Sequence, residues 1–339
     1  MSDSDKLPGV GLDIGTMNIV ASRRGPDGNT RKKVRDAFLD VDPGSRTMLK
    51  LSKVDFVDFQ GSLVIVGDAA LKMANLFKRE ARRPLSKGVI SAGELDAQQI
   101  LLILIEKVTG KPVVDKEKCY YSVPASPIDV DDQDVVYHQM VFKKILASLG
   151  YDPAPTNEAH AIIFSECSAE NFSGLAVSFG AGMCNVALSY QAAMAMDFSV
   201  ARGGDWIDSQ SAKAVGKTAS QMCAIKERGI ETDIVKRTRD EEAISMYTGA
   251  LIEYALKNIA VQFKKVRGQV DLPEPIPFIV SGGTTKINGF MDVFHDEFDK
   301  INKNGGFPIK ISEIRAAKDP LTAVSDGLLV LAESEYDEE

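Results

Sequence analysis

Apolar and polar positions alternate around glycine turns in two stretches of the chain that share one arrangement. In residues 9–22 (GVGLDIGTMNIVAS), apolar runs flank Asp13 and Gly15. In residues 171–190 (NFSGLAVSFGAGMCNVALSY), apolar runs flank a turn that holds two glycines. Each stretch predicts a β-hairpin, because glycine adopts the positive φ angles that tight turns need. The repetition of this pattern, about 165 residues apart, predicts a duplicated α/β fold.

The periodicity elsewhere predicts further strands and helices. Residues 48–59 alternate apolar and polar positions and predict a strand that pairs with 62–66. Pro153 and Pro155 indicate a crossover connection, and the acidic residues 333–339 predict a disordered tail. Leu76 and Met140 are expected on the buried faces of their helices. We further expect strands at 30–38, 118–123, 278–280 and 309–311, and helices at 68–78, 93–109, 131–149, 158–170, 206–215, 218–228, 241–267, 287–300 and 320–332.

Composition narrows the class of protein. The chain has 339 residues, which suits about two domains, and 44% of them are hydrophobic. Its net charge of −8 argues against nucleic acid as a partner, because phosphate backbones need a dense basic surface. Short basic runs at 31–35 and 78–83 are interpreted as solvated faces.

No apolar run is long enough for a membrane span, and the first residues lack an amphipathic anchor. We therefore expect a cytoplasmic protein without direct membrane binding. Four cysteines are widely spaced without a CxxC pair, which makes a zinc site improbable. Cys184 is expected to be a small buried residue rather than a nucleophile.

A third glycine pair follows the apolar strand at 278–280, in the segment Ser281-Gly282-Gly283-Thr284. A strand that ends in glycines before a helix lets a ligand approach the backbone. The first hairpin, taken alone, fits either an ordinary turn or a phosphate-binding loop. In the second interpretation, backbone N–H groups and the Thr16 hydroxyl face an anion, and Asp13 holds a hydrated Mg²⁺.

Together the three glycine turns, DIGTMN, SFGAGMCN and FIVSGGTTKING, resemble the phosphate-1, phosphate-2 and adenosine motifs of the actin-like ATPase superfamily. Four other segments are similar to the MreB-like bacterial actins, which include the MamK type. The resemblance runs from about residue 9 to 332. The four segments are VGDAALKM at 66–73, RRPLSKGVI at 82–90, VARGGDWID at 200–208 and KDPLTAVSDG at 318–327.

The resemblance implies an α/β, actin-like (ribonuclease H-like, duplicated) fold, with two domains around a nucleotide cleft. Each domain has a large and a small subdomain. The first domain is expected to comprise a large subdomain, IA, at 1–38, 85–157 and 320–339, and a small one, IB, at 39–84. The second is expected to comprise a large subdomain, IIA, at 158–202 and 271–319, and a small one, IIB, at 203–270.

The resemblance also implies site residues for ATP or ADP with Mg²⁺. Asp13 would organise the Mg²⁺ ion through water, and Glu158 would place the attacking water. Without the family pattern, Glu158 fits a solvated first residue of a helix, and Lys226 and Glu227 fit an exposed helix end. The implied nucleotide contacts are Gly15, Thr16, Met17, Asn18, Gly180, Ala181, Gly182, Met183, Gly204, Asp205, Lys226, Glu227, Gly282, Gly283 and Thr284.

The second hairpin departs from the family pattern Asp-x-Gly-x-Gly-Thr-x-Asp. Ser178, Met183 and Asn185 stand where that pattern has Asp, Thr and Asp. Ser178 can hydrogen-bond a water of the metal but cannot neutralise the cation. We therefore expect slow hydrolysis, or hydrolysis that depends on Asp13 and Glu158 alone.

The function that the resemblance implies is a cytoskeletal protein that binds ATP and Mg²⁺ and polymerises with itself into filaments. Cytoskeletal or cargo proteins would be further partners. The alternative is a non-polymerising actin-like adaptor of the PilM type, or a pseudo-ATPase scaffold, and the altered second hairpin favours it. A sugar kinase agrees less well, because the acceptor-binding insertions of that class are missing from the sequence.

Overall fold

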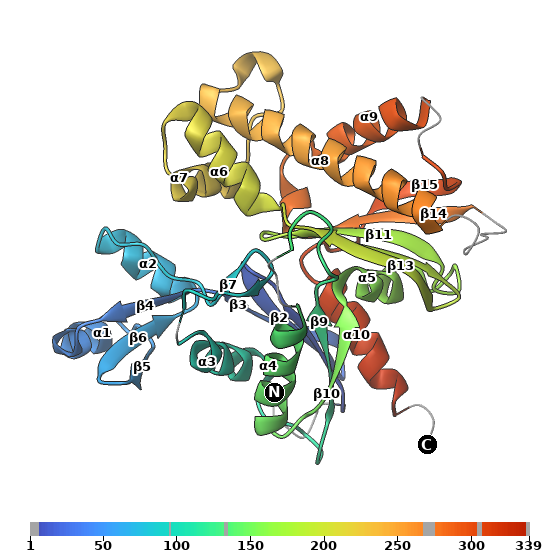
Figure 1. Ribbon diagram of the computed structural model, residues 1–339. Coiled ribbons are helices and arrows are strands. Elements are labelled where there is room, and N and C mark those ends of the chain that lie inside the picture. Colours follow the sequence, from blue (N-terminus) through green and yellow to red (C-terminus); the bar gives the residue numbers. More distant parts are fainter. Residues whose placement is uncertain (1–6, 95, 132–134, 267–274, 304–306, 337–339) are drawn as a thin grey trace.

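The computed structural model describes residues 7–94, 96–131, 135–266, 275–303 and 307–336. Within these residues, two sheets of five strands each form the two halves of the molecule (Figure 1). In the first sheet, β1 and β2 form the predicted hairpin, β3 continues it, and β9 and β10 run parallel to β1. The strands of this sheet, in spatial order, are β10 (Asp152–Asn157), β9 (Lys118–Val123), β1 (Val10–Ile14), β2 (Asn18–Gly25) and β3 (Gly28–Arg35).

The second sheet repeats this order with later segments of the chain. Here β11 and β12 form the hairpin, β13 continues it, and β14 and β15 run parallel to β11. The matching order confirms the predicted duplication. The strands, in the corresponding order, are β15 (Ile311–Ala316), β14 (Ile276–Ser281), β11 (Gly174–Phe179), β12 (Cys184–Tyr190) and β13 (Ala193–Val200).

Two helices form a layer between the sheets. α10 (Ala323–Ser334) packs on β1, and α5 (Glu158–Glu166) packs on β11 and on α10. Glycines permit this close approach. A Cβ at Gly11 would lie 2.0 Å from the Ser325 carbonyl oxygen, and one at Gly327 would lie 1.7 Å from that of Ala161.

Other helices cover the outer faces. α3 (Ala97–Thr109) and α4 (Val135–Ser148) bury apolar side chains against the first sheet. α8 (Arg239–Val266) and α9 (Phe290–Lys303) do so against the second sheet, and α9 follows a short 3-10 turn, η4 (Gly283–Lys286). Most predicted helices are therefore confirmed, with ends that differ by a few residues.

Each half carries an insertion of different build. The first holds a small sheet with its own apolar core, and the second holds helices. The subdomain boundaries given above remain a prediction. The first insertion contains β4 (Phe38–Val41), η2 (Pro43–Ser45), α1 (Arg46–Leu51), β5 (Phe56–Phe59), β6 (Ser62–Val66) and α2 (Asp68–Leu76), followed by the short pair β7 (Leu85–Ser86) and β8 (Val89–Ile90). The second contains α6 (Gly204–Val215), α7 (Ala219–Arg228), η3 (Ile234–Lys236) and α8.

Some predicted elements were wrong. Residues 46–51 form the helix α1 instead of part of a strand. Of the segment 48–59, the strand β5 alone pairs with β6, whose other edge pairs with β4. Asp42 caps the preceding turn η2 by accepting a hydrogen bond from the Gly44 N–H, so the chain enters this region in a helical conformation. The segment with Pro153 and Pro155 is the strand β10, not a crossover. It lies at the sheet edge, where the missing N–H of proline is tolerated.

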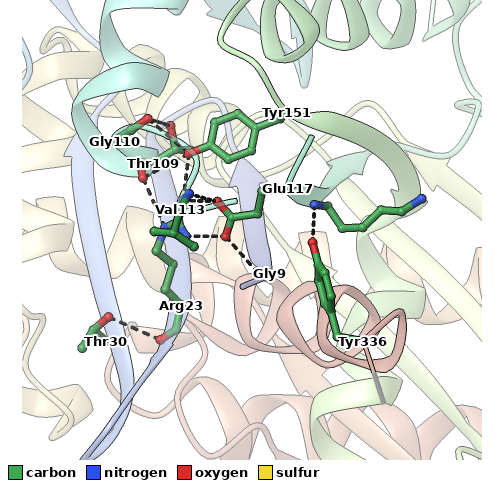
Figure 2. Close-up of polar contacts among 10 residues, drawn as sticks. Gly9, Arg23, Thr30, Thr109, Gly110, Val113, Glu117, Tyr151 and Tyr336 are labelled. Atoms are coloured by element: carbon green, nitrogen blue, oxygen red, sulfur yellow. Dashed lines mark hydrogen bonds and ion pairs between the residues drawn. The ribbon is translucent and has the colours of Figure 1, made fainter. Parts of the chain in front are cut away.

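The other errors concern faces and ends. Met140 is 66% exposed and Leu76 is 69% exposed, because the buried faces of α4 and α2 use other positions of the helical turn. The last strand runs from Ile311 to Ala316 rather than over 309–311. Residues 333–336 of the predicted disordered tail have defined positions, and the Tyr336 hydroxyl accepts a hydrogen bond from the Lys118 N–H at 2.9 Å (Figure 2). Residues 337–339 lie outside the described residues.

Candidate nucleotide site

A cavity of about 520 Å³ opens where the turns of both hairpins and the end of β14 meet. All but one of the predicted site residues line it. The exception is Asp205, whose carboxylate instead lies 3.0 Å from the guanidinium of Arg83. The lining includes Asp13, Gly15, Thr16, Met17, Asn18, Glu158, Ser178, Gly180, Ala181, Gly182, Met183, Gly204, Lys226, Glu227, Gly282, Gly283 and Thr284.

The two hairpin turns have the same geometry. The Gly15 N–H donates to the Asn18 carbonyl oxygen at 3.0 Å, and the Gly180 N–H donates to that of Met183 at 3.0 Å. A Cβ at either glycine would lie 2.9 Å from the oxygen that closes the turn, so both turns need glycine. The predicted repeat thus extends to the hydrogen bonds of the turns.

The turns also touch each other. A Cβ at Gly182 would lie 2.5 Å from the Thr16 hydroxyl oxygen and 2.4 Å from the Gly88 nitrogen. The Thr16 hydroxyl accepts a hydrogen bond from that Gly88 N–H at 3.0 Å. On the other side, the Thr284 hydroxyl donates to the Gly180 carbonyl oxygen at 2.9 Å. These contacts fix both turns on opposite sides of one cavity.

Three residues of the lining carry carboxylates, Asp13, Glu158 and Glu227, and the first two are held by hydroxyl donors. Asp13, on β1, accepts a hydrogen bond from the Ser122 hydroxyl at 3.0 Å. Glu158, the first residue of α5, accepts one from the Ser178 hydroxyl at 2.5 Å and one from the Asn185 amide at 2.8 Å. The pKa of both carboxyl groups is raised, chiefly because burial disfavours the ionised form, and the charge of Asp13 adds to the effect at Glu158.

Several cations surround the same cavity. Lys33 and Arg35 reach it from β3, and Lys286 reaches it from η4. The Arg35 guanidinium donates to the Glu227 carboxylate at 2.9 Å. Lys226 donates to the Asp208 carboxylate at 2.7 Å and to the Gly204 carbonyl oxygen at 2.9 Å. The ammonium of Lys226 is therefore already engaged by the protein.

Sequence reasoning missed some of the lining. Lys33 and Arg35 belong to a basic run that was interpreted as a solvated face. The strand pattern of β3 could have linked Lys33 to Arg35, because residues two apart on a strand share one face. Ser122 also lines the cavity and follows no motif that would have revealed it.

The duplicated sheets, the paired glycine turns and the intervening helices define an actin-like fold. The chain belongs to the volactin family, since that family's sequence pattern matches residues 9–332. A comparison with curated proteins finds no match.

Solved structures agree with this fold. The MamK double helical filament is 17% identical, with a TM-score of 0.68 over 96% of this chain and 98% of that chain. MreB5 of Spiroplasma citri bound to AMPPNP is 17% identical, with a TM-score of 0.63 over 98% and 97%. The ethanolamine utilization protein EutJ from Carboxydothermus hydrogenoformans is 15% identical, with a TM-score of 0.53 over 97% and 93%. The predicted resemblance to the MreB and MamK type of actin is confirmed at the level of the fold.

The described residues form neither a membrane-spanning helix nor a cluster of metal-ligating side chains. None of the helices they form is long and apolar enough to cross a membrane. Nor do they bring together three or more His, Cys, Asp or Glu side chains in a group that could hold a metal ion.

Proposed function

We propose that this cavity binds ATP and ADP with Mg²⁺, and that the protein polymerises with itself into cytoskeletal filaments. The observation that carries nucleotide binding is the meeting of three glycine-rich turns around one cavity lined by cations. Its volume is in the range of small-molecule sites, and glycine backbones let phosphates approach N–H groups. MreB5 of Spiroplasma citri, which shares the fold, was solved with AMPPNP.

The residues present fit Mg²⁺ that is held mainly by phosphates and water. Asp13 offers a carboxylate beside the first turn, and the Ser178 hydroxyl is placed near the second. Mg²⁺ commonly uses one or two carboxylates and keeps several waters. When bound, the ion would neutralise charge on the phosphates.

Glu158 would orient the attacking water, and Asp13 would organise the waters of the ion. Such hydrolysis depends on positioning and charge neutralisation. We propose a slow ATPase whose hydrolysis depends on Asp13 and Glu158. The subdomain boundaries predicted from the sequence are part of the same proposal, as is a cytoplasmic location without direct membrane or nucleic-acid binding.

Self-association is supported by the likeness to the MamK filament. Cytoskeletal or cargo proteins would be further partners. EutJ, which is named for ethanolamine utilization rather than for a filament, supports keeping the alternative of a non-polymerising adaptor or scaffold.

The test combines nucleotide binding with sedimentation. Purified protein should bind a fluorescent ADP analogue, and with ATP it should pellet as filaments that electron microscopy resolves. A monomer that binds nucleotide but never pellets would select the adaptor. Absence of nucleotide binding would refute the proposal.

A matched pair of glycine variants tests the cavity itself. We expect Gly182→Ala to weaken ADP binding about 10- to 100-fold, roughly 1.4–3 kcal/mol, because its Cβ would collide with backbone of the opposite half. Gly249→Ala is the control, since its Cβ would lie 3.8 Å from the nearest atom, Val293 Cγ1. Thermal unfolding checks that both variants fold. Equal ADP affinity in the two variants would contradict the assignment.

A further inference from the structure

The Glu158 carboxylate is held on both oxygens by residues at which this chain departs from the family pattern. The Ser178 hydroxyl donates to Oε1 at 2.5 Å, and the Asn185 amide donates to Oε2 at 2.8 Å. Ser178 and Asn185 are direct partners across β11 and β12, so one rung of the sheet supplies both donors. The two departures thus act on the same side chain.

The orientation of the Asn185 amide is set by its surroundings. Its side chain is fully buried, and its Oδ1 accepts a hydrogen bond from the Ala125 N–H at 3.0 Å. The Nδ2 group must then face Glu158, where it meets an acceptor. An aspartate at this position would keep the bond to Ala125 but would direct a second carboxylate at Glu158.

Ser178 is likewise buried, with 1% of its surface exposed. An aspartate there would add negative charge beside Asp13 and Glu158. A neutral hydroxyl instead stabilises the Glu158 carboxylate and fixes its position. Each Glu158 oxygen keeps a lone pair that can accept a bond from water.

We propose that Ser178 and Asn185 are positioning residues that hold Glu158 in place to orient the attacking water. This inference rests on the proposed role of Glu158 in ATP hydrolysis. On this basis the altered second hairpin is a rebuilt support for Glu158 rather than a degraded metal site. The two interpretations predict opposite changes in kcat for one substitution, Ser178→Asp. A degraded metal site would gain turnover from the added carboxylate, whereas a support for Glu158 would lose it.

The experiment measures phosphate release at saturating ATP, together with the Kd for ADP. Ser178→Ala and Asn185→Asp should each lower kcat about tenfold or more, with the Kd for ADP changed less than about threefold. Ser178→Thr keeps the hydroxyl, so its kcat should lie within about threefold of the wild-type value. Ser178→Asp should also lower kcat, because it directs a carboxylate at Glu158.

Ser189→Ala is the matched control. Ser189 is buried in the same strand as Asn185, but its hydroxyl lies within hydrogen-bond distance of the Phe172 and Ala193 carbonyl oxygens, at 3.0 and 3.2 Å, away from the cavity. This variant should retain the wild-type kcat. The unchanged Kd for ADP distinguishes lost positioning from a misfolded site.

The outcomes separate this inference from the proposed function. If Ser178→Asp turns over ATP faster than wild type, or if Ser178→Ala keeps the wild-type kcat while Glu158→Gln loses it, the inference fails alone. If Glu158→Gln keeps the wild-type kcat, the proposed role of Glu158 fails and the inference fails with it.

Discussion

His138 shows how burial changes the chemistry of a single residue. It lies on α4 with 1% of its surface exposed, and its ring packs edge-on against Phe142 at 4.7 Å between centroids. Neither ring nitrogen has a hydrogen-bond partner among the described residues. Burial lowers the pKa of His138 to about 4.

We expect this histidine to make the protein less stable in mild acid. Below pH 6.5 the unfolded chain protonates His138, whereas the folded protein does not until about pH 4. Stability is therefore lost as the pH falls from 6.5 towards 4, by about 2 kcal/mol at pH 5. Denaturant unfolding of wild type and His138→Leu at pH 7 and pH 5 measures this loss.

The comparison between variants is needed because other groups titrate in the opposite sense. Burial raises the pKa of Asp36 to about 8, so its folded state binds a proton that the unfolded state releases above about pH 4. His295→Gln, an exposed position on α9, is the control and should follow the wild-type curve. If the free energy of unfolding of His138→Leu also changes with pH as that of the wild type does, His138 is not the source of the acid sensitivity.

At single positions, the sequence predicted the residues that a backbone conformation requires. Gly15 and Gly180 were found because a tight turn between apolar runs requires them. Ser178 and Asn185 were noted only as departures from a pattern. Their shared contact with Glu158 depends on the strand register and on where α5 begins, and these are tertiary facts.

At the scale of elements, a buried ion pair joins segments that are distant in the chain. The Arg23 guanidinium on β2 donates to both oxygens of Glu117, at 2.6 and 3.1 Å (Figure 2). Glu117 also accepts hydrogen bonds from the Gly9 and Val113 N–H groups. Tyr151, just before β10, accepts a further bond from Arg23 at 2.8 Å. This network fixes the start of β1, the end of β2 and the entrance to β9.

Replacing Glu117 should therefore cost stability rather than activity. Glu117→Gln leaves the Arg23 charge buried without a counter-charge, and we expect the free energy of unfolding to fall by about 3–5 kcal/mol. Glu253→Gln removes an exposed pair with Lys257 and should change it by less than about 0.5 kcal/mol. Urea unfolding measures both, and equal values for the two variants would contradict the expectation.

Element type was predictable where the periodic pattern is long, as in α3 and α8. It failed in short or unusual segments. The helix α1 has six residues, which are too few for the spacing of apolar positions to distinguish a helix from a strand. The prolines of β10 indicated a connection because the sequence does not show that this strand lies at the sheet edge.

At the scale of the whole molecule, ion pairs cross between the halves. Arg35 on β3 pairs with Glu227 on α7, and Arg83, just before β7, pairs with Asp205 on α6. Figure 1 shows β3 and β7 in one half and α6 and α7 in the other. The repeat predicted two halves that face each other, but not which side chains join them.

The Arg83–Asp205 pair offers the cleaner test of this link, because neither residue lines the cavity. If nucleotide occupies the cavity, Arg83→Gln and Asp205→Asn should each let the halves separate more easily. We expect ADP release to be about threefold faster, which corresponds to roughly 0.7 kcal/mol for a partly exposed pair. The double variant should release ADP no faster than either single variant, since both remove the same contact.

Stopped-flow displacement of a fluorescent ADP analogue measures these rates. Asp240→Asn, which removes a pair with Lys217 inside one insertion, should release ADP at the wild-type rate. Additive effects of Arg83→Gln and Asp205→Asn would mean that the two residues act separately. A link between the halves requires one shared effect, because a single contact can be lost only once.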